Sequence, residues 1–251
     1  MSTIIAGDSH VRVLSIARKE AHFRAALAWA TASEYGALAD SLELFLHPVE
    51  QLYFRSLPAD RRKRSYLLGR YAAKQALRGL SPGLEPAKVE IASGVFQYPV
   101  VRPGMAEPAG VSISHSERVA CAIGYSETHP LAIDVEDLVP DRSEVMKTQI
   151  MPRELEAAGA AWPGLREQHC TMLWTAKEAL SKMLRCGMTC PYELLAVKEL
   201  YAGGGIFGGQ FENFGQYRFQ VWVGGASAMS IVLPRNSTLE TDLGPVVATW
   251  L

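Results

Sequence analysis

Two long amphipathic helices dominate the pattern of hydrophobic and polar positions along the chain. Apolar residues recur at intervals close to 3.6 residues over roughly 60–79 and again over roughly 166–186, and this spacing predicts a helix in each segment. In the second helix, the apolar arc includes Leu173 and Leu180, whereas the opposite, polar arc includes Lys177. We therefore expect each helix to bury one face and to expose the other.

Short strand-like runs of β-branched and aromatic residues follow each helix. They lie at 89–93 and 119–125 after the first helix, and at 194–200, 219–223 and 227–233 after the second. The helices also share a local pattern, because Tyr71–Leu77 (YAAKQAL) matches Trp174–Leu180 (WTAKEAL) 103 positions later. We predict an α+β fold of two similar α+β halves, residues 1–126 and 127–251, packed as an internal pseudo-dimer with its functional site in the cleft between them.

Two other regions give less regular patterns. Within the first 45 or so residues, 10–17 and 42–46 resemble strands and 19–40 resembles a helix; we assign this region no function. The glycine-rich segment 203–209 matches neither a P-loop nor a dinucleotide-binding fingerprint. It is expected to form a hairpin loop.

The composition is that of an ordinary soluble globular protein, with 48% hydrophobic and 20% charged residues among 251. A formal net charge of −1 gives no overall field that would attract nucleic acid or an anionic membrane surface. Any anion site must therefore be built locally. The one dense basic run, Arg61-Arg62-Lys63-Arg64, is typical of a solvated helix start. We expect neither a nucleic-acid partner nor a membrane partner.

The sequence also bears on membrane insertion, secretion and disulfide formation. No stretch approaches the roughly 18 consecutive apolar residues of a membrane span, and the first residues lack the charged-then-apolar order of a signal peptide. Four cysteines are too few and too scattered for a disulfide framework. Neither His169-Cys170 nor Cys186-x-x-x-Cys190 has the ligand spacing of a zinc site. These observations favour a cytoplasmic location with reduced thiols.

An acidic strand is the first candidate for chemistry. Alternation predicts that Ile133 and Val135 face the core, while Asp134 and Glu136 share the other face with Cα atoms about 6.5–7 Å apart. Both acidic residue types are depleted in strands, and two carboxylates on one side repel each other. A hard cation such as Mg²⁺ would relieve that repulsion. A solvent-facing acidic edge is the alternative.

The polar arc of the second helix carries the second candidate. Trp174 lies one turn from Glu178, and a large aromatic side chain is unusual on a plain solvated surface. Trp174 is therefore a candidate to cover the edge of a cleft. The alternative is a solvated face on which Glu178 and Lys182 form an exposed i,i+4 ion pair worth about 0.3–0.5 kcal/mol.

The third candidate is a strand that ends in a Ser-His-Ser turn. Val111 and Ile113 face the core, and Ser114, His115 and Ser116 follow at the strand end. Hydroxyls, an imidazole and the backbone N–H groups of a turn suit a diphosphate. A Ser–His nucleophile pair is the competing interpretation, but adjacent residues on a strand point apart and no Gly-x-Ser-x-Gly elbow is present.

Cations of the first helix add to this picture. Arg70 and Lys74 are one turn apart, with Arg64 earlier in the same helix. They suit a grip on a phosphate, in which Arg makes a bidentate contact. They suit a set of helix-surface charges equally well.

Taken in order, the segments SISHS (112–116), AIDVE (132–136) and WTAKEALSK (174–182) resemble the three signature motifs of the 4′-phosphopantetheinyl transferase superfamily, in sequence and in spacing. GRYAAKQAL (69–77) resembles the helix that precedes them in that superfamily. The length and the duplicated halves resemble the surfactin-type branch, whose members are monomeric pseudo-dimers, more than the short trimeric holo-acyl-carrier-protein synthases.

The resemblance implies Mg²⁺ as the cofactor, held by Asp134, Glu136 and Glu178 in the C-terminal half, and coenzyme A as the co-substrate. It implies that Glu178, with Asp134 and Lys182, acts on a serine of an apo acyl or peptidyl carrier protein. That serine loses its proton and attacks the β-phosphate of coenzyme A, and 3′,5′-ADP leaves. The implied coenzyme A contacts are Arg64, Arg70, Lys74, Ser114, His115, Lys177 and Lys182.

The chain departs from the superfamily pattern at one place before the Ser-His-Ser turn. Gln97-Tyr98-Pro99 stands where Gly-Lys-Pro is common, and Tyr98 cannot supply the lysine's charge at neutral pH. Two other functions remain open at this point. One is a non-catalytic relative that binds coenzyme A or carrier proteins, and the other is an unrelated acyl-coenzyme A-dependent transferase that acts at the thioester without Mg²⁺.

Overall fold

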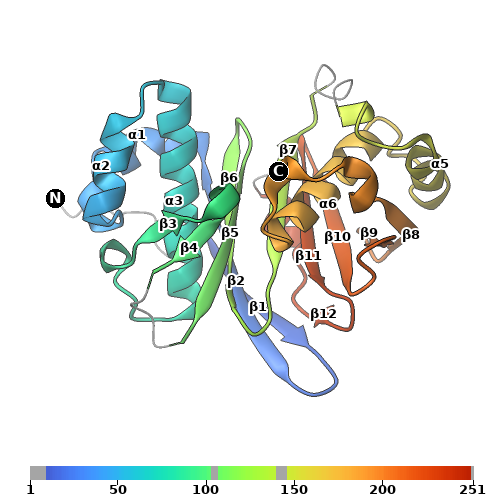
Figure 1. Cartoon of the computed structure of the whole chain (residues 1–251), viewed down its shortest axis with the longest axis horizontal. Coiled ribbons are helices and arrows are strands. Elements are labelled where there is room, and N and C mark those ends of the chain that lie inside the picture. Colours follow the sequence, from blue (N-terminus) through green and yellow to red (C-terminus); the bar gives the residue numbers. More distant parts are fainter. Residues whose placement is uncertain (1–9, 103–106, 140–145, 250–251) are drawn as a thin grey trace. The chain divides into compact units, whose positions relative to one another are not determined.

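The structure is a computed structural model that describes residues 10–102, 107–139 and 146–249. The chain forms two compact units (Figure 1). Unit 1 comprises Met1–Pro130 with Leu239–Thr241, and unit 2 comprises Leu131–Thr238 with Asp242–Leu251. The predicted boundary after residue 126 stays a prediction, as does the assignment of the halves as separate domains. None of the described helices is long and apolar enough to cross a membrane.

Unit 1 contains a five-stranded sheet covered by one long helix, α3 (Asp60–Leu80). The sheet order is β12-β1-β2-β6-β5. The strands are β1 (Val11–Ala17), β2 (His22–Thr31), β5 (Ala109–His115), β6 (Val119–Ser126) and β12 (Thr238–Leu239). Helix α3 packs against β2, β6 and β5, because its apolar face, which includes Leu67 and Leu77, is wholly buried there.

Smaller elements complete unit 1. A two-stranded sheet pairs β3 (Ile91–Ser93) with β4 (Pro99–Val101). Two short helices, α1 (Tyr35–Ala39) and α2 (Pro48–Ser56), precede α3. The 3-10 helices are Ala32–Glu34, Leu42–Leu44, Pro86–Lys88 and Val95–Gln97.

Unit 2 also packs one long helix on a five-stranded sheet. Its five-stranded antiparallel sheet has the order β7-β11-β10-β9-β8, and helix α6 (His169–Met183) packs against β7, β11 and β10. The strands are β7 (Ala132–Asp137), β8 (Val197–Gly203), β9 (Ile206–Phe211), β10 (Tyr217–Gly224) and β11 (Ser227–Pro234). The remaining helices are α5 (Pro152–Ala161), α7 (Gly244–Val247) and the 3-10 segments Gly187–Thr189 and Tyr192–Leu195.

The two units repeat one order of elements. A strand (β2 or β7) is followed by a short helix (α2 or α5), a long helix (α3 or α6) and four strands. The first strand pairs with the last in both sheets, since β2 lies beside β6 and β7 lies beside β11. The predicted α+β class and the two similar halves are therefore confirmed.

A buried lysine–glutamate ion pair occurs at corresponding positions in each unit. Lys74 Nζ lies 2.8 Å from Glu50 Oε2 in unit 1, and Lys177 Nζ lies 2.7 Å from Glu154 Oε2 in unit 2. Each glutamate is the third residue of a helix that begins with proline, and its carboxylate accepts the backbone N–H of the residue before that helix. Each also accepts the N–H of the first residue of β3 or β8. The pair thus ties the short helix, the long helix and a strand together.

The two units differ at one position beside this pair. Gln75 follows Lys74 in α3, whereas Glu178 follows Lys177 in α6. Strand β2 contains no aspartate or glutamate, whereas the corresponding β7 contains three carboxylates. Acidic chemistry is therefore confined to unit 2 at these matched elements.

Two predictions for the N-terminal region are wrong. Residues 22–31 form the strand β2 instead of a helix, because β2 is a central strand whose residues Ala25–Ala30 are buried on both faces and show no alternation. Residues 42–44 form a 3-10 helix instead of a strand, because Leu42, Phe45 and Leu46 turn together into the core at helical spacing.

The other element predictions agree with the structure. The strand expected at 10–17 is β1, and the helices expected at 60–79 and 166–186 are α3 and α6. The glycine-rich segment forms the β8–β9 hairpin, in which Gly204 and Gly205 have φ values of 60° and 77°. Two consecutive positive φ values explain why glycine occupies this turn.

Candidate active site

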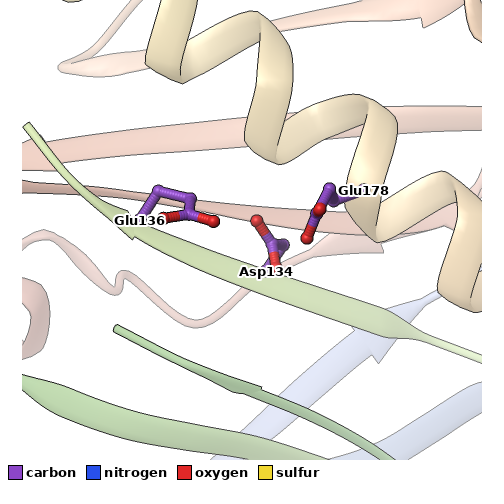
Figure 2. A group of neighbouring side chains, drawn as sticks. All are labelled: Asp134, Glu136 and Glu178. Atoms are coloured by element: carbon purple, nitrogen blue, oxygen red, sulfur yellow. The ribbon is translucent and has the colours of Figure 1, made fainter. Parts of the chain in front are cut away.

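Three carboxylates meet in unit 2. Asp134 and Glu136 extend from β7, and Glu178 extends toward them from α6 (Figure 2). One ligand oxygen from each of the three lies within 4.8 Å of the others. We call Asp134, Glu136 and Glu178 the acidic triad. The alternation of β7 places its two members on one side, as the sequence predicted.

Burial of the acidic triad excludes a plain acidic edge. Asp134 is only 1% exposed, and Glu136 and Glu178 are half-buried. Asp134 lies opposite Ser230 of the neighbouring strand β11, and the Ser230 hydroxyl is 2.6 Å from that of Thr175 in α6. An unpaired carboxylate charge buried to this extent would be costly.

The protonation of Glu178 reflects this crowding. Burial, followed by the charge of Asp134, raises the pKa of Glu178 from its usual value near 4.5 to about 8. The nearby Lys182 lowers this pKa, but it does not cancel the other effects. In the absence of a cation, the buried position and the neighbouring Asp134 thus favour the protonated form of Glu178.

Lys182 supplies a positive charge to the acidic triad. Its Nζ lies 2.7 Å from Asp134 Oδ1 and donates to the carbonyl oxygen of Ile133 at 3.3 Å. The alternative of an exposed i,i+4 pair between Glu178 and Lys182 does not describe the site, because Glu178 is half-buried and Lys182 also pairs with the buried Asp134. Its side chain remains 27% exposed, so Lys182 is accessible to a ligand.

The donor set fits a hard divalent cation. All three ligands are carboxylates, and oxygen ligands are those that Mg²⁺ prefers. Among the described residues, the acidic triad is the one group of three or more potential metal-ligating side chains. A cation would replace the proton that Glu178 holds and would remove the repulsion between the carboxylates.

The sequence predicts coenzyme A contacts for Lys177 and Lys74, but both side chains lie in the interior of their units. Both ammonium groups are wholly buried, each against its own glutamate. Lys177 Nζ also donates to the carbonyl oxygens of Gln149 and Tyr192, and Lys74 Nζ to carbonyl oxygens near β3. A phosphate cannot reach a group whose donors face protein atoms on all sides. The expected polar face of α6 is thus buried at Lys177, because α5 packs over it.

A pocket of about 660 Å³ lies in unit 1. It brings together two predicted residues, Arg70 and His115, with Gln97 at its wall. Ser114, the residue before His115, is buried in β5. The pocket is lined by Tyr53, Leu57, Arg62, Ser65, Tyr66, Gly69, Arg70, Gln97, Pro99, Ile113 and His115.

Helical geometry separates Arg64 from this pocket. Arg64 precedes Arg70 by six residues, which is about 240° around a helix, so the two point to different sides. The Arg64 side chain is exposed and its guanidinium lies 5.8 Å from the centre of the Tyr35 ring. Arg62 and Tyr66, which the prediction missed, precede Arg70 by eight and four residues and do line the pocket. Counting back from Arg70 by whole helical turns would have found them.

Tyr98, which stands in place of the superfamily's lysine, packs away from the pocket lining. A Cβ atom added at Gly94 would lie 2.6 Å from the Tyr98 ring, so the ring rests directly on that glycine. Phe96 and Gln97, just before it, have φ values of 59° and 65°. This unusual backbone turns Gln97 into the pocket and Tyr98 onto Gly94.

Comparison with known proteins finds a family that is similar to most of unit 2. Residues 130–232 match the family model described as the 4′-phosphopantetheinyl transferase superfamily, and this match contains the whole acidic triad, Lys177 and Lys182. A 4′-phosphopantetheinyl transferase of Bacillus subtilis is 26% identical over 117 residues, which cover 46% of this chain and 50% of that protein. The chain thus spans about half the length of the curated relative it matches. Residues 130–232 are thus similar to the 4′-phosphopantetheinyl transferase superfamily.

A solved structure was also found at low similarity. It is a holo-(acyl-carrier-protein) synthase from Bacillus anthracis in complex with CoA (3′,5′-ADP), with 18% sequence identity. The match covers 46% of this chain and 97% of that chain, with a TM-score of 0.37. A TM-score this low gives no support to an assignment of function. The surfactin-type branch stays a prediction.

Proposed function

We propose that this protein transfers the 4′-phosphopantetheine group of coenzyme A to a serine of an apo acyl or peptidyl carrier protein and releases 3′,5′-ADP. It acts as a monomer and requires Mg²⁺. The acidic triad carries the proposal, because three converging carboxylates lie in the segment that matches the superfamily. A protein that only bound coenzyme A or a carrier would not need such a cation site.

Glu178 is the group that accepts the proton of the carrier serine. General bases are side chains positioned beside the reacting group, and Glu178 lies with Asp134 and Glu136 in the acidic triad. The serine oxygen then bonds to the β-phosphorus, and the bond to the oxygen that leaves with 3′,5′-ADP breaks. Mg²⁺ held by Asp134, Glu136 and Glu178 would supply Lewis-acid stabilisation of the phosphate charge.

Lys182 and Asp134 act together at this step. Asp134 orients the ammonium group of Lys182 at 2.7 Å, and the partly exposed ammonium neutralises negative charge that develops on the phosphate. The remaining charge on Asp134 raises the pKa of Glu178. One buried carboxylate therefore serves as a ligand, as an anchor for a cation and as an electrostatic partner of the base.

We assign coenzyme A phosphates to the cationic pocket of unit 1. Arg70 and Arg62 line it from α3, and His115 lines it from the end of β5. Arg70 is held in place because its guanidinium lies 4.9 Å from the centre of the Tyr66 ring and its Nε is 3.4 Å from Glu50 Oε1. This assignment does not include Lys74 and Lys177, which are buried in ion pairs, or Arg64, which is not part of the pocket lining.

Intact-protein mass spectrometry tests the proposal. The full chain is incubated with coenzyme A, Mg²⁺ and a panel of apo fatty-acid, polyketide and peptide-synthetase carrier proteins, with EDTA added to a parallel set. We expect one carrier to gain the mass of one phosphopantetheine, and EDTA to abolish the gain. Glu178→Gln should be inactive, whereas Glu156→Gln, an exposed carboxylate outside the triad, should match the wild type.

The products separate the proposed transfer from the other functions. Release of 3′,5′-ADP marks phosphopantetheine transfer, whereas release of free coenzyme A from an acyl thioester without Mg²⁺ would mark an acyltransferase. Coenzyme A binding without modification of any carrier would contradict the proposal and would favour a non-catalytic binding protein.

A further inference from the structure

Cys186 and Cys190 lie side by side where the chain leaves α6. Their sulfur atoms are 3.9 Å apart, and both side chains are half-buried. The neighbouring Arg185 and Gly187 have φ values of 55° and 57°, so the backbone reverses direction around Cys186 and returns toward it. This reversal, which the spacing of the two cysteines does not reveal, brings the two thiols together.

A metal site does not explain the pair. Among the residues that the structure describes, the acidic triad is the one cluster of three or more potential ligands, and neither cysteine belongs to it. Structural zinc sites in proteins are almost always four-coordinate, so two thiols alone are too few. Oxidation to a disulfide is the chemistry that needs these two thiols and nothing else from the protein.

We propose that Cys186 and Cys190 form a redox modification site, where a hydroperoxide or a small disulfide such as oxidised glutathione converts them to an intrachain disulfide. With a hydroperoxide, one thiolate attacks the O–O bond, becomes a sulfenic acid and releases an alcohol or water. The second thiolate attacks that sulfur and expels water after protonation, so that two electrons pass to the peroxide. The sulfurs must approach by roughly 1.9 Å to reach a bond of about 2.05 Å.

The surroundings of the two thiols assign their roles in this reaction. Burial, followed by a hydrogen bond with Cys190, raises the pKa of Cys186 to about 11. The Cys186 thiol also points toward the carbonyl oxygens of Ser181 and Gly187, at 3.5 Å and 3.3 Å. Because these contacts hold the Cys186 thiol against backbone carbonyl oxygens, Cys190 reacts first with the oxidant and Cys186 closes the disulfide.

The disulfide would act on the helix that carries the triad. Two residues after Cys190, the Tyr192 ring stacks on the Trp174 ring with centres 5.3 Å apart and planes at 27°. The Tyr192 carbonyl oxygen accepts a hydrogen bond from Lys177 Nζ at 3.4 Å. Trp174 lies one helical turn before Glu178 on α6. A shift of Cys190 toward Cys186 therefore pulls on contacts immediately beside the proposed base.

This regulatory consequence rests on the proposed transferase function. A displacement of about 1 Å at a catalytic constellation can lower a rate by up to roughly 100-fold. We therefore expect the oxidised protein to transfer phosphopantetheine roughly 10- to 100-fold more slowly than the reduced protein. Reduction with dithiothreitol should restore the rate.

Thiol counting tests the modification without reference to activity. The reduced full chain is treated with oxidised glutathione, then denatured, alkylated and analysed by intact mass and peptide mapping. We expect two of the four cysteines, Cys121 and Cys170, to be alkylated and a peptide cross-linked between Cys186 and Cys190 to appear. Cys186→Ser should retain glutathione on Cys190. Four alkylated cysteines, or a different pairing, would overturn the proposal.

Rate measurements test the consequence. Reduced, oxidised and re-reduced wild type are compared with a Cys186→Ser/Cys190→Ser double variant treated in the same way, and only the wild type should respond to oxidation. An unchanged rate in fully oxidised wild type would overturn the regulatory role. If the reduced protein modifies no carrier, the proposed function fails, and Mn²⁺ titration of both forms decides instead. Equal Mn²⁺ affinities in the two forms would overturn the coupling to the acidic triad.

Discussion

The buried pair of Lys177 and Glu154 gives the sharpest quantitative prediction. Both side chains are 0% exposed and their charged atoms are 2.7 Å apart. Replacing Lys177 with Met leaves the Glu154 charge buried without its cation, although Glu154 keeps its hydrogen bonds from the N–H groups of Met151 and Val197. Breaking a buried pair in this way costs about 3–5 kcal/mol, and the two retained hydrogen bonds place the expected loss toward the lower end.

Urea denaturation followed by circular dichroism measures this loss. Lys177→Met should lower the free energy of unfolding by about 3 kcal/mol, whereas Lys198→Met should change it by less than about 1 kcal/mol because Lys198 and Glu199 are an exposed pair. The double variant Lys177→Met/Glu154→Gln should recover part of the loss, since it removes both charges. Hydrogen exchange should place the weakened amide protection in α5 and α6.

One result would refute this reasoning. If Lys177→Met unfolds at nearly the same urea concentration as the wild type but shows a raised KM for coenzyme A, then Lys177 contacts the nucleotide, as the superfamily resemblance implied. A stability loss with an unchanged KM would establish the structural role. The two readouts are independent, so each variant gives a decision between the two roles.

Three further predictions concern the site. Glu178→Gln should abolish transfer while leaving the circular dichroism spectrum unchanged, and near-wild-type turnover would contradict the role of Glu178 as the base. The pKa of Glu178 is raised to about 8 in the folded protein, so the metal-free folded state favours protonated Glu178. The contribution of Glu178 to the free energy of unfolding should therefore be largest below about pH 4.5 and should be lost as the pH rises through about 8. Melting temperatures in EDTA should show this fall, and Mg²⁺ or Glu178→Gln should remove it; a fall of equal size in Glu178→Gln would exclude Glu178 as its source. His115→Ala should raise the KM for coenzyme A severalfold, whereas Arg64→Ala, which alters a residue outside the pocket lining, should not; equal effects would argue against the pocket of unit 1.

The acidic triad illustrates what the sequence can predict. The alternation around Asp134 and Glu136 fixes their common side on a strand, and these positions together with Glu178 stand in motifs that resemble one superfamily. Local periodicity is sufficient here because the two strand carboxylates lie on a single element. Their convergence with Glu178, by contrast, depends on how α6 packs on β7, and only the match to the motifs anticipates it.

The burial of the two lysines and the wrong prediction for β2 have a common physical cause, which is packing between elements distant in sequence. Periodicity identifies the polar arc of α6, but it cannot show that Glu154 of α5 covers Lys177. Lys74 is buried for the same reason, because Glu50 covers it. Strand β2 resembles a helix in sequence because a strand buried on both faces has no alternation to detect.

The matched positions Gln75 and Glu178 bear on metal stoichiometry. Both units are built around the same buried ion pair, yet the element that corresponds to β7 in unit 1 presents no carboxylates, and the glutamate of the long helix is replaced there by an amide. We therefore expect the described residues to provide one high-affinity site for a divalent cation, in unit 2, and none at the matched elements of unit 1. The repeat therefore provides the buried ion pair in both units and the cluster of three carboxylates in unit 2 alone, among the residues that the structure describes.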